Sequence, residues 1–204
     1  MENSKTGNSR RTFLKTSLLA GGGLMIHFSG LAKFALPHTD EGVPAMVLSE
    51  INGYVKISGD NIITLVCPNP EFGQNVMTSL PMMVAEELEV DWKKVVVEMG
   101  PHDNVKLGPQ FTGGSNSMRM YWKPLREAGA TARNMLMLAA ADTWKVPVEE
   151  LSTKLGIVKH EKSGKQATYG DFAAKASGIP VPKGIKLKNV KDFTVVRKSQ
   201  KNVE

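Results

Sequence analysis

The sequence predicts an α+β fold in which antiparallel β-hairpins are covered on one face by two main helices. Three observations predict it. Short β-rich runs are separated by clusters of turn formers, apolar residues recur with helical spacing over residues 76–90, and a longer apolar stripe covers residues 118–143. Hydrophobic residues make up 41% of the 204 residues, which is enough for a sizeable core.

The first hairpin is expected from residues 54–57 and 62–66, which are β-rich and flank the turn formers Ser58-Gly59-Asp60-Asn61. It should end at Pro68-Asn69-Pro70, because proline cannot donate a hydrogen bond to a β-ladder. Cys67 is the only cysteine, so no internal disulfide can form. We expect it to be a small buried hydrophobe, which alone cannot make a zinc or iron–sulfur site.

The first helix is predicted by the spacing of its apolar residues, Val76, Leu80, Met83, Val84 and Leu88. The same period places Glu86 and Glu87 on the solvent-exposed face. Thr78 or Ser79 is expected to cap the helix, and Pro81 fits a first helical turn. A strand is expected at residues 94–99.

The second helix follows a loop, residues 100–114, that has no hydrophobic period and is typical of functional loops. Its apolar stripe is predicted to be core and consists of Met118, Tyr121, Trp122, Leu125, Ala128, Gly129, Ala132, Met135, Leu136, Ala139, Ala140 and Thr143. Gly129 among alanines permits close approach of another backbone. Pro124 must either begin or kink this helix.

The last part of the chain predicts shorter elements. Residues 156–160 and 165–169 should form a second hairpin around Lys162-Ser163-Gly164, followed by a short helix over residues 169–177. Residues 193–196 read as a final strand. The locally basic stretch 183–201 is interpreted as a solvated tail or linker. His102 and His160 are expected to be exposed and receive no role.

The charge distribution excludes a nucleic-acid-binding protein. The formal net charge is +6, but residues 1–35 hold five basic side chains against one acidic side chain. The remainder has 21 basic and 19 acidic side chains, a balance that leaves no basic patch for a nucleic acid.

The N-terminus resembles a twin-arginine export signal at Ser9-Arg10-Arg11-Thr12-Phe13-Leu14-Lys15. The apolar run after it, residues 16–36, is interrupted by glycines and His27, so no stable membrane span is expected. We therefore expect residues 1–40 to be a leader read by the twin-arginine translocase, and the mature protein to be periplasmic. Because that route carries folded proteins with inserted cofactors, it favours a redox protein.

Two polar stretches stand directly before the predicted helices: Glu71–Ser79 and Phe111–Ser117. Glycines, hydroxyl groups and free backbone N–H groups at a helix start favour a phosphorylated ligand. Thr112, Ser115 and Ser117 add hydroxyl donors, and the Gln74 amide suits the edge of a heterocycle. Composition alone leaves a second interpretation open, a plain helix cap with a flexible turn. Neither a P-loop nor a dinucleotide fingerprint is present.

These two stretches, continued through residues 72–92 and 111–130, resemble the molybdopterin-binding large subunit of isoquinoline 1-oxidoreductase-type enzymes, in the xanthine dehydrogenase and aldehyde oxidase superfamily. The resemblance covers the chain from its leader to about Asn202. It implies a partial molybdopterin-binding domain at residues 45–178, followed by a linker and the start of a further domain at residues 179–204.

The resemblance further implies a molybdenum hydroxylase that acts on N-heterocycles or aldehydes. Its cofactor would be molybdopterin, as the cytosine dinucleotide, with molybdenum. Its partners would be a small [2Fe–2S] subunit and the remainder of the large subunit. The implied cofactor-binding residues are Gly73, Gln74, Thr112, Gly113, Gly114, Ser115 and Ser117. The family usually has glycine where this chain has Asn75, a residue that tolerates left-handed backbone.

No catalytic or metal-ligating residue is assigned to this chain. The catalytic glutamate of the family lies far downstream, so we expect the chain alone to be inactive and to expose apolar surface where a missing part packs. Two alternatives are a non-catalytic exported α+β domain and the relic of a truncated gene.

Overall fold

The computed structural model of the chain describes residues 48–203. The predicted twin-arginine leader, residues 1–40, falls outside the described residues. Among residues 48–203, no helix is both long enough and apolar enough to cross a membrane.

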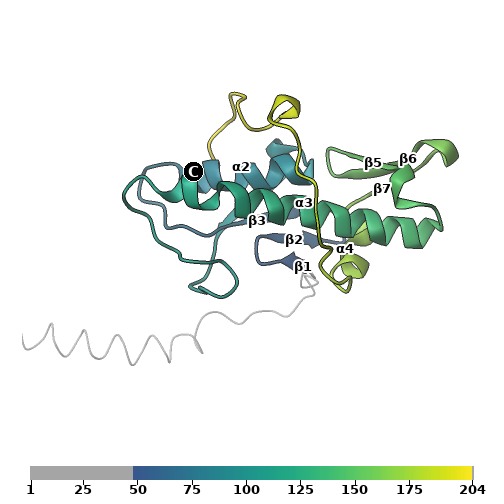
Figure 1. The fold of residues 1–204 in the computed structure, drawn as a ribbon, viewed down its shortest axis with the longest axis horizontal. Coiled ribbons are helices and arrows are strands. Elements are labelled where there is room, and N and C mark those ends of the chain that lie inside the picture. The colour runs from purple at the N-terminus through teal and green to yellow at the C-terminus, as the bar shows by residue number, and fades with distance from the viewer. Residues whose placement is uncertain (1–47, 204) are drawn as a thin grey trace, which may run out of the picture. The chain divides into compact units, whose positions relative to one another are not determined.

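In the described part of the chain, the larger sheet has four strands: β1 (Leu48–Asn52), β2 (Val55–Ser58), β3 (Ile63–Cys67) and β4 (Val95–Met99). They lie in chain order (Figure 1), and β2 and β3 form the predicted antiparallel hairpin. β4 runs parallel to β3, with Cys67 opposite Met99. A parallel pair needs a crossover connection, which helix α2 (Val76–Leu88) provides. The carboxyl ends of β3 and β4 therefore meet at one edge of the sheet.

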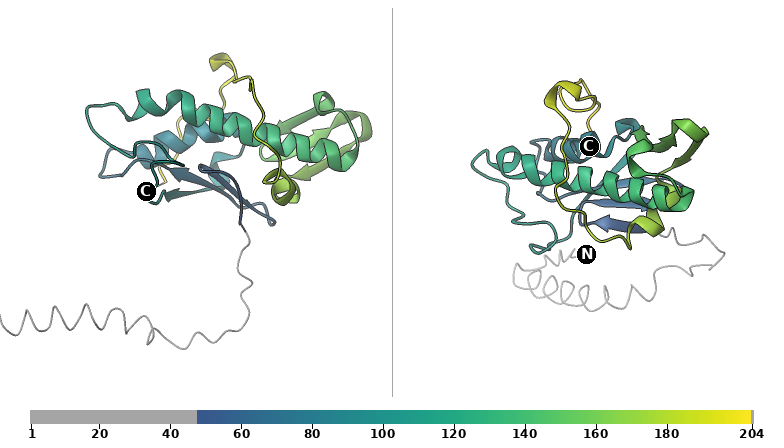
Figure 2. Two further views of the ribbon diagram at one scale, coloured as in Figure 1. Left: turned by 60° about the horizontal axis from the view of Figure 1, so that its bottom comes forward. Right: turned by 45° about the vertical axis from the view of Figure 1, so that its right-hand side comes forward.

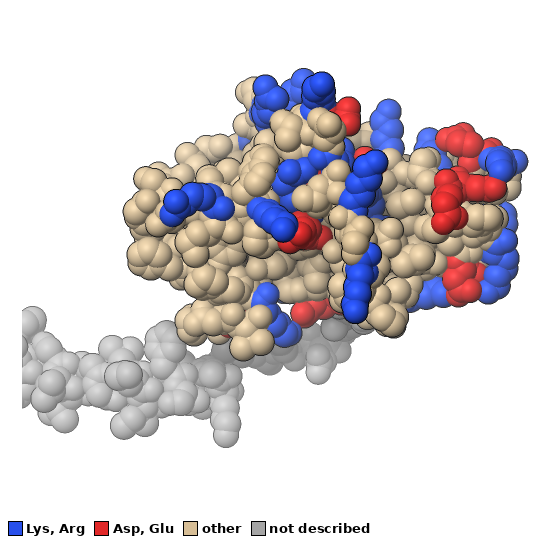
Figure 3. Space-filling model, in the orientation of Figure 1, with Lys and Arg blue, Asp and Glu red and all other residues tan. Residues whose placement is uncertain are grey.

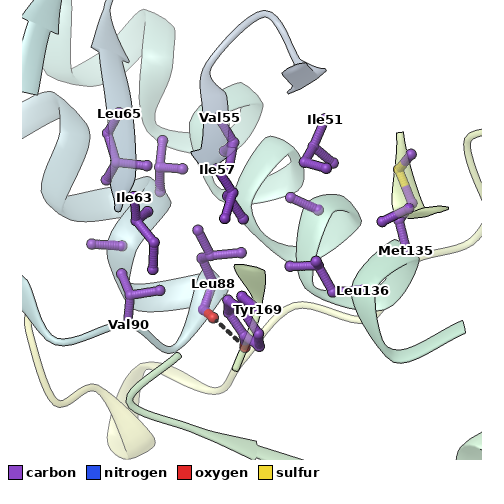
Figure 4. Close-up of a cluster of buried hydrophobic side chains, with 14 of the residues drawn as sticks. Ile51, Val55, Ile57, Ile63, Leu65, Leu88, Val90, Met135, Leu136 and Tyr169 are labelled. Carbon is purple, nitrogen blue, oxygen red and sulfur yellow. Dashed lines mark hydrogen bonds between the residues drawn. The ribbon is translucent and has the colours of Figure 1, made fainter. Parts of the chain in front are cut away.

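Helices α2 and α3 (Ser117–Trp144) pack along each other on one face of this sheet, together with the short helix α4 (Gly170–Ala176) (Figure 2). This confirms the predicted α+β architecture. The core between the sheet and the helices is formed by branched aliphatic side chains and Tyr169, whose hydroxyl donates to the carbonyl of Leu88 at 2.8 Å (Figure 4). Cys67 is fully buried, as predicted.

The close approach predicted at Gly129 is confirmed. A methyl group on its Cα would lie 2.4 Å from the carbonyl oxygen of Val84 and 3.0 Å from Cβ of Glu87. Both contacts are to α2, so α2 and α3 meet backbone to backbone at this residue. Pro124 does not begin α3, because it lies inside the helix. Met118, predicted as core, is instead 43% exposed.

The start of α2 differs from the prediction in two ways. The N-cap is Asn75 with φ 63°, so neither Thr78 nor Ser79 caps the helix. Pro81 lies inside the helix, beyond its first turn. The left-handed backbone that a family glycine would adopt is thus present at Asn75, because asparagine accepts this conformation at low cost.

A second, three-stranded antiparallel sheet contains β5 (Leu151–Lys154), β6 (Ile157–His160) and β7 (Lys165–Thr168). The hairpin of β6 and β7 was predicted, whereas β5 was not. Single-turn 3-10 helices precede β5 and join β6 to β7, at Val148–Glu150 and Glu161–Ser163. His160 is buried rather than exposed, because its ring nitrogens contact Ser163 Oγ at 2.7 Å and Glu150 Oε2 at 2.8 Å.

The C-terminal segment, residues 188–196, is not a strand and not a solvated tail. It contains a single 3-10 turn, Val190–Asp192, and its Phe193 and Val195 are buried. The rings of Phe193 and Trp122 lie beside each other, 6.2 Å apart, and both contact the Arg126 guanidinium, with ring centroids 5.1 and 5.4 Å from its carbon. Lys and Arg side chains follow the course of this segment on the surface drawn in Figure 3.

The glutamates predicted to face solvent hold this segment in place. Glu86 and Glu87 are 1% and 0% exposed. Glu86 accepts hydrogen bonds from the backbone N–H groups of Thr194, Val195 and Val196, and Glu87 accepts from Arg126 and from Lys188 N–H. The helical period alone could not show that a distant segment covers this face.

Candidate functional site

Two loops meet beyond the carboxyl ends of the parallel strands. The loop after β3 leads into α2, and the loop after β4 leads into α3. Between them is an open hollow of about 370 Å³. It is lined by Phe72, Gln74, Val76, Thr112, Gly113, Ser115, Ser117 and Met118. Ligands of sheets with parallel strands are commonly bound at this edge, because the loops that follow the strands converge there.

Five of the seven predicted binding residues line this hollow: Gln74, Thr112, Gly113, Ser115 and Ser117. Gly73 and Gly114 lie in the same two loops, with φ of 100° and 57°, but not on the lining. Thr112 Oγ1 and Gln74 Nε2 both donate to the carbonyl of Pro70, each at 3.0 Å. Two stretches 40 residues apart in sequence are therefore joined into one site.

The start of α2 does not have the free N–H groups that the sequence suggested. The carboxylate of Glu71 accepts from the backbone N–H groups of Gly73, Gln74, Asn75 and Met77, at 2.6 to 3.1 Å. Desolvation acts to raise the pKa of Glu71, but these four bonds outweigh it and lower the pKa to about 2. An anion of the chain itself thus occupies this helix start, and the anion-binding interpretation is wrong for α2.

The start of α3 is different. No side chain caps this helix, because the side chain of Asn116 accepts from Arg119 Nη2 at 2.7 Å instead. Ser115 precedes it at φ 54°, a left-handed backbone that serine rarely adopts. Backbone strain of this kind is frequent at ligand sites, where the surrounding structure holds it. Of the two helix starts at the hollow, α3 is the one that can receive an anionic group.

Asn69 holds the two loops together, and the sequence analysis did not single it out. It is fully buried, and its Nδ2 donates to the carbonyl of Phe111 at 2.8 Å and to Ser117 Oγ at 2.9 Å. Its Oδ1 is the one buried side-chain polar atom without a hydrogen-bond partner in the described part of the chain. A polar residue between two prolines directly after a buried strand was the signal that could have revealed it.

Replacing Asn69 by leucine is expected to lower the free energy of unfolding by about 2 kcal/mol, because the buried Ser117 hydroxyl and the part-buried carbonyl of Phe111 lose their donor. Urea unfolding of the purified chain would measure this. Thr112→Val is the matched control, since it removes one exposed hydrogen bond between the same loops and should cost less than about 0.5 kcal/mol. Equal unfolding midpoints for the two variants would show that Asn69 does not hold the loops.

Other side chains that could act as a nucleophile or a base are not in an environment that supports this role. Burial raises the pKa of the Cys67 thiol to about 11, so it is not a reactive thiolate. Glu86 and Glu87 are engaged by the C-terminal segment and lie outside the hollow lining. Among residues 48–203, no three His, Cys, Asp or Glu side chains gather as a metal site.

Comparisons with known proteins found similar sequences. The chain is 40% identical to isoquinoline 1-oxidoreductase subunit beta of Brevundimonas diminuta over 71% of its length, and 34% identical to the membrane-bound aldehyde dehydrogenase [pyrroloquinoline-quinone] of Gluconacetobacter polyoxogenes over 82%. It spans 19% and 21% of these two relatives, about a fifth of their length.

Among solved structures, quinoline 2-oxidoreductase from Pseudomonas putida 86 is 18% identical, with a TM-score of 0.47 over 65% of this chain and 17% of that chain. The family assignment rests on a broader match. The model of the molybdopterin cofactor-binding domain matches residues 5–203, which include both loops of the hollow. The chain belongs to the family of molybdopterin cofactor-binding domains.

Proposed function

We propose that this chain is the N-terminal part of the large subunit of a molybdenum hydroxylase, an oxidoreductase that hydroxylates N-heterocycles or oxidises aldehydes. Its relatives carry the names of an isoquinoline oxidoreductase subunit and an aldehyde dehydrogenase, which motivates both substrate classes. The observation that carries the proposal is the hollow itself, built from the two loops on which the family resemblance rests.

The residues of the hollow fit a molybdopterin cofactor. Its lining combines apolar side chains, Phe72, Val76 and Met118, with amide and hydroxyl groups, as a flat heterocycle with a polar edge requires. The uncapped start of α3 suits a phosphate group. The Oδ1 atom of Asn69 is buried beside these loops and is a hydrogen-bond acceptor without a donor.

In this proposal the chain binds and orients the cofactor. Gln74 pairs with the edge of the pterin, while Thr112, Ser115, Ser117 and the first N–H groups of α3 hold the phosphate side. Gly113 lets the phosphate come close to the backbone, and Glu71 keeps the loop before α2 in shape. When bound, the cofactor supplies two-electron redox chemistry at molybdenum.

The remainder of the enzyme comes from outside this stretch. The proposal includes the cytosine dinucleotide form of molybdopterin, a small [2Fe–2S] subunit that takes up electrons, and export to the periplasm by the twin-arginine translocase. It also holds that the chain alone is inactive, because the relatives are about five times as long as the matched stretch.

The test is metal and cofactor analysis of the protein purified from the exported fraction with the chains that copurify. We expect molybdenum and a pterin in equal amounts. The double variant Thr112→Val with Ser115→Gly removes two hydroxyl groups, and glycine accepts the left-handed backbone of residue 115 without strain. Cofactor retention should fall about tenfold or more.

Ser177→Gly makes the same chemical change outside the hollow and should retain the cofactor fully. Full retention of the cofactor by the double variant would mean that these loops do not bind it. Pyrroloquinoline quinone in place of molybdenum and pterin would refute the molybdenum proposal. Neither cofactor, in a preparation that contains the rest of the large subunit, would favour a non-catalytic exported domain.

A further inference from the structure

The outer edge of β4 is an unusually apolar edge strand. β4 is the last strand of its sheet and carries three consecutive valines, Val95 to Val97. All five β3 side chains are buried, whereas every β4 side chain is half-buried or exposed. Val96 is 48% and Met99 41% exposed. Among the described residues, no strand pairs with this edge.

The edge strand β7 of the smaller sheet provides the contrast. Its first two residues, Lys165 and Gln166, are exposed and polar. Natural sheets protect free edges with charged side chains, especially lysine, because an apolar edge recruits other strands. β7 has this protection, and the valines of β4 do not. The one charged residue of β4, Glu98, forms an ion pair with Lys56 of the same sheet, in β2.

A groove of about 690 Å³ lies along β4. One wall is formed by Trp92 and the three valines, and the other by residues 199–203 of the C-terminal segment. Three hydrogen bonds hold that second wall against α2, its cap and Trp92. Trp92 Nε1 donates to the carbonyl of Lys201 at 3.3 Å, Asn202 Nδ2 donates to Asn75 Oδ1 at 3.1 Å, and Val203 N–H donates to Thr78 Oγ1 at 3.2 Å. The lining contains Lys93 and Lys201 but no carboxylate.

We propose that this groove receives a strand from the remainder of the large subunit, which adds to the sheet at the outer edge of β4. The inference rests on the proposed function, since that function supplies the remainder. About four-fifths of each curated relative lies outside the matched stretch. Residues 199–203, which form the second wall of the groove, lie within the stretch that the family model matches.

The chemistry of the groove specifies the occupant. The incoming strand is rich in β-branched residues, which pack on the pleated valine surface. It carries an acidic residue that faces Lys93 and Lys201, the two cations of the lining. Its backbone pairs with the free N–H and carbonyl groups of β4, in the manner of strand addition to an exposed sheet edge.

Hydrogen exchange tests the proposal, with the 204-residue chain compared with the same chain in the assembled large subunit. The alternate amides of residues 95–99 that point away from β3 should exchange at least about tenfold more slowly in the assembly, because they gain backbone partners. The amides of β7, residues 165–168, are the internal control and should not change. Unchanged exchange in β4 of a molybdenum-containing assembly would overturn this inference and leave the proposed function standing.

Val96→Lys gives a second test, because lysine on an edge strand discourages strand addition. The side chain of Val96 is half exposed, so the variant should fold, and its affinity for the remainder should fall about tenfold. Gln166→Lys on β7 should assemble normally, and a Val96→Lys variant that assembles equally well would refute the proposal. Protection of β4 that rises with the concentration of the chain alone would identify a second copy as the occupant and overturn it. If no remainder associates at all, both this inference and the proposed function fail.

Discussion

Replacing Glu86 by alanine is expected to lower the free energy of unfolding by about 4 kcal/mol, in the range found when one partner of a buried ion pair is removed. The carboxylate is 1% exposed and receives Lys188 Nζ at 2.6 Å. It also accepts N–H groups from three successive residues, including Val195 at 2.6 Å and Val196 at 2.9 Å. The variant leaves these N–H groups without an acceptor. It also takes the nearest carboxylate from the Lys188 ammonium, only 11% exposed, which keeps the carbonyl of residue 86 at 3.3 Å and Glu89 Oε1 at 3.6 Å.

Urea unfolding measures the effect, and limited proteolysis should show faster cleavage within residues 188–200, because these residues lose their anchor on α2. Glu127→Ala is the matched control. Glu127 pairs with Lys123 at 3.7 Å on the exposed face of α3, so its removal should cost less than about 0.5 kcal/mol. If the two variants unfold at the same urea concentration, Glu86 does not anchor the segment.

The same residue predicts a dependence on pH. Desolvation acts to raise the pKa of Glu86, but Lys188 and the backbone N–H groups outweigh it, and the pKa is lowered from 4.5. A carboxyl with a lowered pKa binds protons less readily in the folded state than in the unfolded state. Its stabilisation is therefore complete above the ordinary pKa and is lost as the pH falls through the lowered value. The difference in stability between the wild type and Glu86→Ala should shrink in that acidic range.

Gly129→Ala is expected to destabilise the fold by about 3 kcal/mol, at the upper end of the cost of overpacking a core. The new methyl group would lie 2.4 Å from the Val84 carbonyl oxygen, a backbone atom that cannot rotate away. α2 and α3 would have to separate along their shared contact. The result opposes helix propensity, since alanine is about 1 kcal/mol better than glycine in a helix interior.

Thermal or urea unfolding would measure this change. Gly59→Ala is the control, because a methyl group at residue 59 meets nothing within 4 Å, and we expect its effect to stay within about 0.5 kcal/mol. A Gly129→Ala variant as stable as the wild type would mean that α2 and α3 can move apart at little cost, contrary to the packing described above.

Glu86 and Gly129, the sites of these two predictions, both lie at the junction of α2, α3 and the C-terminal segment. Gly129 brings α3 against α2 beside Glu87, and Glu87 joins Arg126 of α3 at 2.7 Å to the C-terminal segment. That segment continues to residues 199–203, which form one wall of the groove along β4. The junction thus places the groove, while Asn69 joins the two loops of the hollow beyond the ends of β3 and β4.

Local patterns were sufficient for most of the elements. The turn cluster at Ser58–Asn61 defined the first hairpin, the apolar stripe defined α3, and the small residue Gly129 marked the helix contact. The two loops were also recognised as cofactor-binding stretches. Glycines and hydroxyl groups before both helices left a plain helix cap open, and the resemblance to molybdopterin-binding subunits assigned them to the cofactor. Each of these features depends on residues close in sequence or on a periodicity that short windows contain.

Two of the wrong predictions, at residues 193–196 and at Glu86 and Glu87, involve partners distant in sequence. The prediction that residues 193–196 form a strand rested on their composition. Among residues 48–203 no strand pairs with them, and their N–H groups bond to Glu86, about 110 residues away. The start of α2 was mispredicted for a different reason. Glu71 lies close in sequence to the N–H groups that it accepts, but its carboxylate reaches them only through the conformation of the loop, which the residue pattern does not show.

The sequence by itself therefore determined the family, the α+β class, the main helices and the two loops that meet at the hollow, because these depend on motifs and short-range periodicity. Only the tertiary structure decided which helix start is open, which charged side chains are buried and which sheet edge is left apolar. A carboxylate becomes a buried anchor, and a strand an edge, only when distant segments supply or withhold their partners.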